Sequence, residues 1–395
     1  MTWDALQTRR EFLTAAAVAG FVVARRTPPH AETAAERHVP WTMYIGTYTK
    51  TGKSKGIYRV SVDPVTLQFG TLELASETPD PSFLAITPDG RALVAVNELV
   101  EFGGQASGSV TVFARNAASG ALTVLSPSRA SRGAAPCYVS IDRTGRQVMV
   151  ANYVGGNVAV LPLATSGALG EAGTVLARTG KGPHPVRQVA PHAHCILPDP
   201  GNRFVLMSDL GTDKIHVARL DAATGALTPA DVPEVSLRPG SGPRHLAFSP
   251  DGQTLYVVTE LDSTIVAFAY NRATGGLTER QRISTRPAGA TIENFPADLH
   301  VHPTGRTVYA SNRGDDTIAV FAVDATSKAL SLVQSVPTGG SGPRNFTLTP
   351  DGTGLLVANQ RSDSILAFQV DAVTGQLAAT GQVLDAPVPV CLTFA

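Results

Sequence analysis

Short hydrophobic runs alternate with turn signals along residues 242–279, and the same pattern returns along almost the whole chain. The stretch reads GPRHLAFSPDGQTLYVVTELDSTIVAFAYNRATGGLTE. Its three runs rich in β-branched and aromatic residues are HLAFS, TLYVVT and TIVAFAY, separated by Pro-Asp-Gly and Asn-x-x-Thr-Gly-Gly. Such runs between glycine-containing turns predict antiparallel strands joined by hairpins. We therefore expect a meander of three strands, followed by a fourth strand after Leu277.

The pattern repeats every roughly 50 residues, which is the range of propeller blades rather than of helical solenoids. Two markers follow it along the chain. The turn glycines of six units are Gly90, Gly145, Gly201, Gly252, Gly305 and Gly352. Hairpins with Ser/Thr-Gly lie at 119–120, 166–167, 224–225, 274–275 and 374–375, with degenerate forms at 65–67 and 327–328. The six turns and seven hairpins together indicate seven units, one of which lacks its own inner strand.

The two ends of the repeat region supply the missing strand. The C-terminal run PVCLTFA, residues 389–395, matches the inner-strand run PRNFTL, whereas the N-terminal run MYIGTY begins one strand late. Pairing these ends closes a ring and leaves only short, protected sheet edges. We predict an all-β, seven-bladed propeller over residues 42–395, with four-stranded antiparallel blades closed by the C-terminal strand. Helices should be scarce, because no apolar face of helical length follows residue 40.

The N-terminal segment differs from the repeats. Thr8-Arg9-Arg10-Glu11-Phe12-Leu13 precedes a ten-residue apolar run that is too short to span a bilayer. It resembles a twin-arginine export signal, so we predict a signal peptide over 1–31, a linker over 32–41 and a periplasmic or extracellular protein. Cleavage could follow Ala24 or Ala31. The alternative is an amphipathic N-terminal tail.

Composition describes an ordinary soluble globular protein. The 395 residues are 43% hydrophobic and 16% charged, with no net charge, so a basic nucleic-acid surface is not expected and no stable membrane insertion is predicted. Three scattered cysteines, Cys137, Cys195 and Cys391, are too few for a disulfide framework. Each lies in a predicted inner strand, so we expect free, buried thiols.

Aligned repeats point to one mouth of the ring, because the loop before the first strand and the loop after the second lie on the same face of a meander blade. Polar residues recur at both places, although the strands between them are mostly Val, Ala and Leu. The charged and imidazole side chains gathered there are His192, His194, Arg244, His245, Glu260, Arg313 and Arg344, with Asp209, Glu293, Asp298 and His300 nearby.

One position in the fourth unit departs from the pattern. Proline precedes the inner strand in five of the six units, but His192 takes that place in the run PHAH. The other copies show which residue the fold alone requires at this position, so the histidine found here favours a functional role. Recurring asparagines after the second strand favour turn formation, and Asp209 and Asp213 fit turns or contacts between blades. Three guanidinium groups around one channel repel one another unless an anion is present, which favours an anion-binding cluster.

These motifs as an ensemble resemble a known family. The runs PHAH and SDLGTDKI, GPRHLAFSPDG, HPTGRTVYASNRGDDTIAVF and SGPRNFTLTPDG are similar to the seven-bladed lactonases, which include bacterial 6-phosphogluconolactonases and fungal carboxy-muconate cyclases. The resemblance covers residues 42–395. It implies hydrolysis or closure of a small, anionic lactone in the channel mouth, with no cofactor and no obligatory metal.

The resemblance also implies a site made of histidine, arginine and glutamate. By position, the catalytic residues are His194 (or His192), Arg244, Glu260 and Arg313. The expected substrate contacts are His192, His245, Arg344, Asp209 and Asn312. Because the chain is predicted to be exported whereas phosphogluconolactone is cytosolic, the physiological substrate could be another sugar or organic-acid lactone.

The residue types fit that chemistry. Lactone opening passes through a tetrahedral oxyanion, which arginine donors stabilise, and water activation needs a base with a pKa near 7. We expect His194 to meet this need unaided, while Glu260, held by arginines, stays ionised and orients its neighbours or serves as an alternative base.

Two other functions remain open from the sequence. A non-catalytic propeller could bind a ligand or protein partner, since the fold does not determine the function. A metal-dependent sugar lactonase could draw oxygen ligands from Glu98, Asp209, Glu260 and Asn312, although nearby arginines disfavour a divalent cation. The identity of the lactone, the direction of the reaction and the oligomeric state are open as well.

Overall fold

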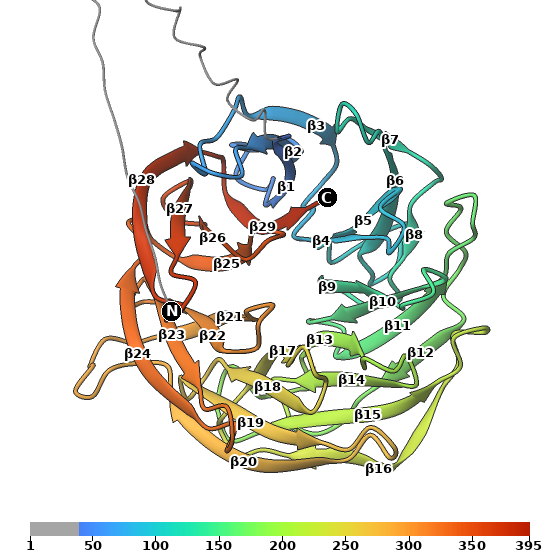
Figure 1. Cartoon of the computed structure of the whole chain (residues 1–395). Helices are drawn as coiled ribbons and strands as arrows, with labels where there is room; N and C mark the ends of the chain where they lie inside the picture. Colours follow the sequence, from blue (N-terminus) through green and yellow to red (C-terminus); the bar gives the residue numbers. More distant parts are fainter. Residues whose placement is uncertain (1–38) are drawn as a thin grey trace, which may run out of the picture. The chain divides into compact units, whose positions relative to one another are not determined.

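The computed structural model describes residues 39–395, which form seven antiparallel sheets arranged as a ring (Figure 1). Each sheet has four strands in its main path, which are consecutive in six sheets, whereas the first sheet joins the C-terminal strand to the first three strands, and one sheet has a fifth short strand. No helix occurs within this range, and nothing in it could cross a membrane as an apolar helix. The predicted all-β, seven-bladed propeller is confirmed. The predicted signal peptide and most of the linker lie outside the described residues.

The blades are numbered from the one that contains the first strand. The inner strands, which face the centre of the ring, are β29 (Pro389–Phe394), β4 (Phe83–Ile86), β9 (Pro136–Ile141), β13 (Ala193–Pro198), β17 (Pro243–Phe248), β21 (Phe295–Val301) and β25 (Pro343–Leu348) for blades 1 to 7. The second strands are β1 (Trp41–Thr47), β5 (Ala92–Asn97), β10 (Gln147–Asn152), β14 (Phe204–Asp209), β18 (Thr254–Thr259), β22 (Thr307–Arg313) and β26 (Gly354–Asn359).

The remaining strands form the outer half of each blade. The third strands are β2 (Gly56–Val62), β6 (Ser109–Arg115), β11 (Asn157–Pro162), β15 (Lys214–Leu220), β19 (Thr264–Tyr270), β23 (Thr317–Val323) and β27 (Ser364–Val370). The outermost strands are β3 (Glu73–Glu77), β7 (Leu122–Val124), β12 (Thr174–Ala177), β16 (Leu227–Ser236), β20 (Leu277–Ser284), β24 (Leu330–Pro337) and β28 (Leu377–Asp385), and β8 (Arg129–Ala130) pairs with β6.

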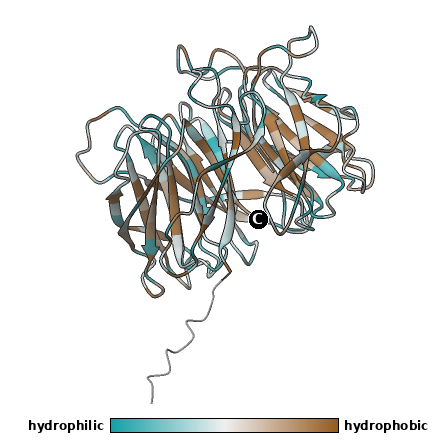
Figure 2. Ribbon diagram, turned by 90° about the horizontal axis from the view of Figure 1, so that it is seen from above, coloured by the Kyte–Doolittle hydropathy of each residue, from teal (hydrophilic) through white to brown (hydrophobic). Residues whose placement is uncertain are grey.

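The hydrophobic core lies between neighbouring blades. Second strands such as β14 and β18 are buried at every residue, because both faces of their sheet are covered. One cluster joins Phe204 and Leu206 of blade 4 to Val257 and Phe268 of blade 5. Figure 2 shows the hydrophobic residues concentrated on the strands. The seven interfaces explain why the sequence carries near-continuous apolar runs rather than a strict alternation.

The turn markers behave as predicted, with one exception. Gly252 and Gly352 have positive φ angles of 62° and 77°, a conformation that glycine adopts without steric cost. In the fourth unit the left-handed residue is Asn202, at 54°, rather than the aligned Gly201. The degenerate hairpins also keep the geometry, since Leu67 and Lys328 have φ angles of 56° and 61°. The three cysteines are free, buried and on inner strands, as expected.

The C-terminal strand closes the ring. β29 pairs antiparallel with β1, from Met43 opposite Phe394 to Thr47 opposite Pro389 (Figure 1). It also contacts the two adjacent inner strands: Leu84 N–H lies 3.4 Å from Cys391 Sγ, and Leu392 N–H donates to Asn345 Oδ1 at 2.6 Å. Blade 1 therefore combines the two ends of the described chain.

Deleting residues 389–395 should lower the free energy of unfolding by several kcal/mol, because blade 1 loses its inner ladder and the edges of β1 and β25 lose their cover. Thermal melting of the truncated and parent proteins measures the effect. Deleting Ala395 alone is the control and should cause a much smaller change. Equal melting temperatures for the long deletion and the parent would contradict the closure scheme.

Candidate active site

Irregular pairing at the start of the inner strands turns site residues toward the mouth of the ring. In blade 5 the register jumps from Pro243 to Leu246, so Arg244 and His245 have no regular partner on β18. The same shift occurs in blade 7 between Pro343 and Asn345. Proline supplies no N–H to the ladder, and bulges re-aim side chains beside functional sites. The bulged residues include His194, Arg244, His245, Asp298 and Arg344.

A buried carboxylate holds three guanidinium groups at this mouth. Glu260, which follows β18 directly, has only 3% of its side chain exposed. Its Oε2 accepts from Arg244 Nε at 2.9 Å and from Arg313 Nη2 at 2.8 Å, while Arg187 Nη2 donates to Oε1. These arginines come from blade 5, blade 6 and the loop between β12 and β13. The site thus joins three separate segments through one side chain.

The arginines keep Glu260 ionised. Burial alone would raise the pKa of this carboxyl, but the charges of Arg313, Arg244 and Arg187 outweigh it and hold the pKa well below its usual range. Two of the guanidinium groups also retain free donors: Arg244 Nη2 and Arg313 Nη1 donate to no residue within 39–395. The cluster can therefore still bind an incoming anion.

A second arginine group lies near the first. Arg344 Nη2 donates to the hydroxyl of Tyr48 at 2.9 Å, and that hydroxyl donates to Glu98 Oε2 at 2.8 Å. The charge of Glu260 acts on the pKa of Arg344, so the two groups share one electrostatic environment. With Arg187, Arg244, Arg313 and Arg344 against Glu98 and Glu260, the mouth carries an excess of positive charge.

His192 is a half-buried imidazole with a defined tautomer. Its Nδ1 lies 2.9 Å from the carbonyl oxygen of Tyr153, which can only accept, so in the neutral ring Nδ1 carries the proton and Nε2 keeps a lone pair. The ring stacks on Tyr153 at a centroid distance of 4.4 Å. Arg187 Nη2 donates to the Tyr153 hydroxyl at 3.2 Å, which connects His192 to the arginine cluster.

His194 is more deeply buried than the sequence suggested. Its ring makes edge contacts with Tyr153 and His245, and its Nδ1 lies 3.7 Å from Cys137 Sγ. Burial, reinforced by Arg244, lowers the pKa of His194 well below its usual value. The expectation that this imidazole titrates near its unperturbed pKa is therefore wrong. His194 stays neutral through the physiological range.

His245 and Asp298 support Arg244 from below the mouth. His245 Nδ1 lies 2.7 Å from Asp298 Oδ1, and its Nε2 lies 3.1 Å from Arg244 Nη1. A neutral imidazole satisfies both contacts, donating through Nδ1 and accepting through Nε2. Burial, with the charge of Arg244, lowers the pKa of His245 to about 4. Asp298 also accepts from His300 and Asn345, so this chain of contacts runs through blades 5, 6 and 7.

Two predicted substrate contacts are held by structural hydrogen bonds, although Asp209 Oδ2 is buried without a described partner. Asn312 is fully buried, and its amide makes four hydrogen bonds to Thr285, Asn294 and Thr317. Asp209 Oδ1 accepts from the backbone N–H groups of His192 and Gly211, so it holds the run that carries His192. Asp213 is a loop-fixing residue, as expected. Glu293 lines a neighbouring hollow rather than the arginine cluster.

Sequence reasoning missed Arg187 and Tyr48, each for a definable reason. Arg187 lies in a long loop before blade 4 that has no counterpart in the other repeats, so no internal comparison includes it. Tyr48 follows β1 as Glu98 follows β5, but no turn joins β29 to β1, so blade 1 lacks the glycine on which the other units align. Aligning blades on their second strands would have included Tyr48.

The oxygen donors considered for a metal do not form a cation site. Within residues 39–395, no three His, Cys, Asp or Glu side chains are grouped so that they could hold a metal ion. Glu260 is surrounded by arginines, and Asn312 is committed to Thr285. The metal-dependent alternative finds no support in this arrangement.

Comparisons with known proteins agree on one family. The family model "Lactonase, 7-bladed beta-propeller" matches residues 42–394. A 6-phosphogluconolactonase of Bacillus subtilis is 35% identical over 89% of this chain and 97% of its own length. A 6-phosphogluconolactonase of Formosa agariphila is 31% identical over 78% of this chain and 86% of its own. The solved structure of a Pseudomonas aeruginosa periplasmic gluconolactonase superposes with a TM-score of 0.83 and 34% identity, covering 90% of this chain and 99% of that one.

We expect the melting temperature to be nearly constant above pH 7 and to fall as the pH drops from about 6.5 towards 4. Burial keeps the pKa of His245 at about 4, whereas an unfolded imidazole titrates near about 6.5. Below about pH 6.5 the unfolded chain binds more protons than the folded protein does. The stabilisation that is present above this pH is therefore lost as the pH falls. Calorimetry of the wild type and His245→Gln checks this, and an equally steep fall in the variant would contradict it.

Proposed function

Because the chain belongs to the family of seven-bladed β-propeller lactonases and is a lactone hydrolase, we propose that its catalytic site is the arginine-lined mouth around Glu260. The observation that supports this placement is the buried carboxylate with its three guanidinium partners, two of which retain unused donors. A propeller that only binds a partner has no need of such a cluster. The similarity to named lactonases also favours the enzyme over the alternatives.

The proposed reaction is hydrolysis of the ring ester. Water attacks the lactone carbonyl carbon while a base takes its proton, and the free N–H groups of Arg244 and Arg313 hold the resulting oxyanion. The bond between the carbonyl carbon and the ring oxygen then breaks, and the departing alkoxide takes the proton back from the base. The product is a hydroxy acid, which loses its carboxyl proton to solvent at neutral pH, and the resulting carboxylate has a favourable position among the arginines until release.

The contacts favour His192 as the base, with His194 as the other candidate. His192 is partly exposed, and its Nδ1 contact leaves a lone pair on Nε2. His194 is buried, and its lowered pKa makes it a weaker proton acceptor. The lowered pKa of Glu260 makes its carboxylate too weak a base to take a proton from water, so its proposed role is to orient the arginines. His245 and Asp298 then position Arg244, and Arg344 contributes attraction for an anion.

The positive excess at the mouth supports an anionic lactone of a sugar or organic acid as substrate. The relatives named 6-phosphogluconolactonase and gluconolactonase make sugar lactones the first class to test. We further propose that residues 1–31 direct export, which the twin-arginine run and the periplasmic neighbour support. Cell fractionation against a periplasmic marker tests this location.

Replacing Arg187 by Ala should lower kcat/KM on an accepted lactone by roughly 100-fold, because the proposed site loses one positive charge and Glu260 loses the group that holds its Oε1. Arg187 is the only described partner of that buried oxygen, so the melting temperature should fall as well, and the kinetics are measured well below it. Steady-state kinetics on 6-phosphoglucono-1,5-lactone and glucono-1,5-lactone measure the effect. Arg219→Ala, which removes a surface partner of Asp231, is the matched control. Full activity of Arg187→Ala with a much lower melting temperature would make the cluster structural.

Substitutions of His192 and of His194 should have different kinetic effects. His192→Gln should lower kcat by at least about 100-fold with little change in KM, because a general base acts in the transition state. His194→Gln should have a smaller effect on kcat, since its neutral ring packs beside the site. Kinetics of both variants over pH 5 to 8 measure this difference. A nearly active His192→Gln beside an inactive His194→Gln would reassign the base to His194.

A further inference from the structure

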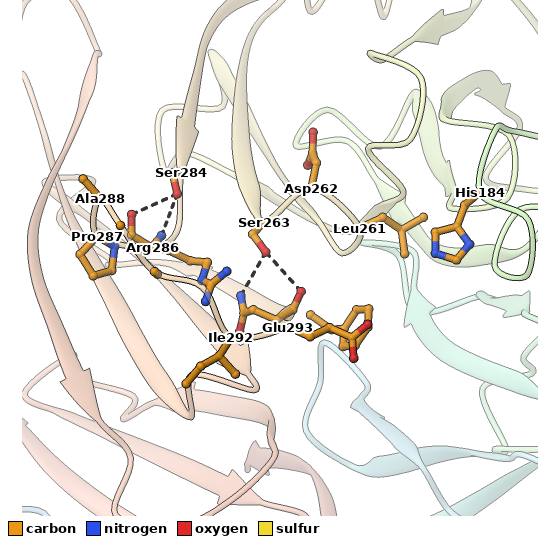
Figure 3. A pocket seen from close by; sticks show the side chains of 14 residues that line it. His184, Leu261, Asp262, Ser263, Ser284, Arg286, Pro287, Ala288, Ile292 and Glu293 are labelled. Atoms are coloured by element: carbon orange, nitrogen blue, oxygen red, sulfur yellow. Dashed lines mark hydrogen bonds between the residues drawn. The ribbon is translucent and has the colours of Figure 1, made fainter.

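A large hollow lies beside the arginine cluster, on the same side of the ring as the mouth. Its volume is about 700 Å³, and two loops and a turn surround it. Figure 3 shows His184 and Leu261 at one end and Arg286 and Ala288 at the other, with Ser263 between them. The polar lining comes from His184, Asp262, Ser263, Ser284, Arg286, Glu293 and Asn294.

The hollow and the proposed catalytic cluster are built from the same chain segments. Its turn, Leu261 to Ser263, follows Glu260 in the chain, and His184 precedes Arg187 on the same loop. Phe295 belongs to both: its carbonyl oxygen accepts from Arg313 Nε at 3.0 Å, and its ring lies 5.8 Å from Arg187 Cζ. None of the three arginines lines the hollow, so the shared Phe295 and the shared loop and turn place the hollow next to the cluster rather than inside it.

The charges around the hollow are largely compensated. Asp262 pairs with Arg238 and Arg282, and Arg286 forms a two-contact ion pair with Asp315. The hollow thus lacks the positive excess of the arginine cluster. A neutral group fits its electrostatics better than a second anion does.

Two polar groups in the hollow remain available to a ligand. His184 Nδ1 accepts from the N–H groups of Val186 and Arg187, so in the neutral ring Nε2 carries a proton that no residue within 39–395 accepts. The carboxylate of Glu293 is exposed and makes no hydrogen bond or ion pair with a described residue. Ile292 and Phe295 add apolar surface beside this donor and acceptor.

We propose that the hollow binds a neutral sugar unit attached to the lactone, so that the enzyme accepts lactones of oxidised disaccharides. This inference rests on the proposed lactonase site and extends its substrate class. Hydroxyl groups of a sugar both donate and accept, which matches Glu293 and His184, and the C–H face of a sugar ring suits the apolar residues. The volume lies in the range of ligand pockets and exceeds the needs of a single six-carbon lactone.

The test compares two neutral lactones, maltobiono-1,5-lactone and glucono-1,5-lactone, so that substrate charge is matched. Wild-type kcat/KM should be about tenfold higher for the disaccharide lactone, the equivalent of one or two neutral hydrogen bonds. Glu293→Ala, which removes the acceptor, and Ala288→Arg, which fills the hollow with a charged side chain, should each abolish this preference. Glu77→Ala, on the outer strand β3 of another blade, is the matched control and should keep it.

Calorimetric titration with maltose and glucose separates the two proposals. Maltose should bind the wild type more tightly than glucose does, and this difference should disappear in Ala288→Arg. Equal kcat/KM for both lactones without maltose binding would overturn the inference and leave the lactonase site intact. Maltose binding without hydrolysis of either lactone would support the hollow as a sugar site and overturn the proposed mechanism.

Discussion

A carboxylate withdrawn from water is the constraint that organises the mouth of this propeller. An ionised Glu260 is stable there only because three guanidinium groups replace its hydration, and breaking such a buried pair is strongly destabilising. The partners come from blade 5, blade 6 and the loop before blade 4. The same contacts therefore fix the relative positions of these segments and leave N–H groups of Arg244 and Arg313 without a described partner. Structural cohesion and the proposed catalytic preorganisation have one origin in this site.

The fold was predictable because the chain contains its own controls. Six copies of one unit distinguish what a blade needs, such as the turn glycines, from what a single blade adds, such as His192. The closure of the ring followed from the offset between residues 42 and 395, and β29 pairs with β1 as expected. The exception at Gly201, where Asn202 takes the left-handed conformation, shows that a turn can keep its geometry while its residues change places.

The candidate site could be predicted from the sequence only at positions that recur in every blade. Arg244, Glu260 and Arg313 occupy positions shared by all blades, and the structure brings them together. Arg187 lies in a loop unique to one blade, so no periodic comparison could reveal it. Environment was also hidden from the sequence: the low pKa of His194 follows from burial beside Arg244, and the commitment of Asn312 follows from packing against Thr285. These properties depend on three-dimensional neighbours.

The link between the last strand and the site affects how the enzyme is made. Leu392 N–H donates to Asn345, Asn345 donates to Asp298, and Asp298 holds the imidazole that contacts Arg244. During translation blades 2 to 7 can form in order, but Leu392 becomes available only after all of them have been synthesised. The finished arrangement around Arg244 thus needs β29 in place. A polypeptide that stops before β29 would contain every proposed catalytic side chain and still lack the support that aligns them.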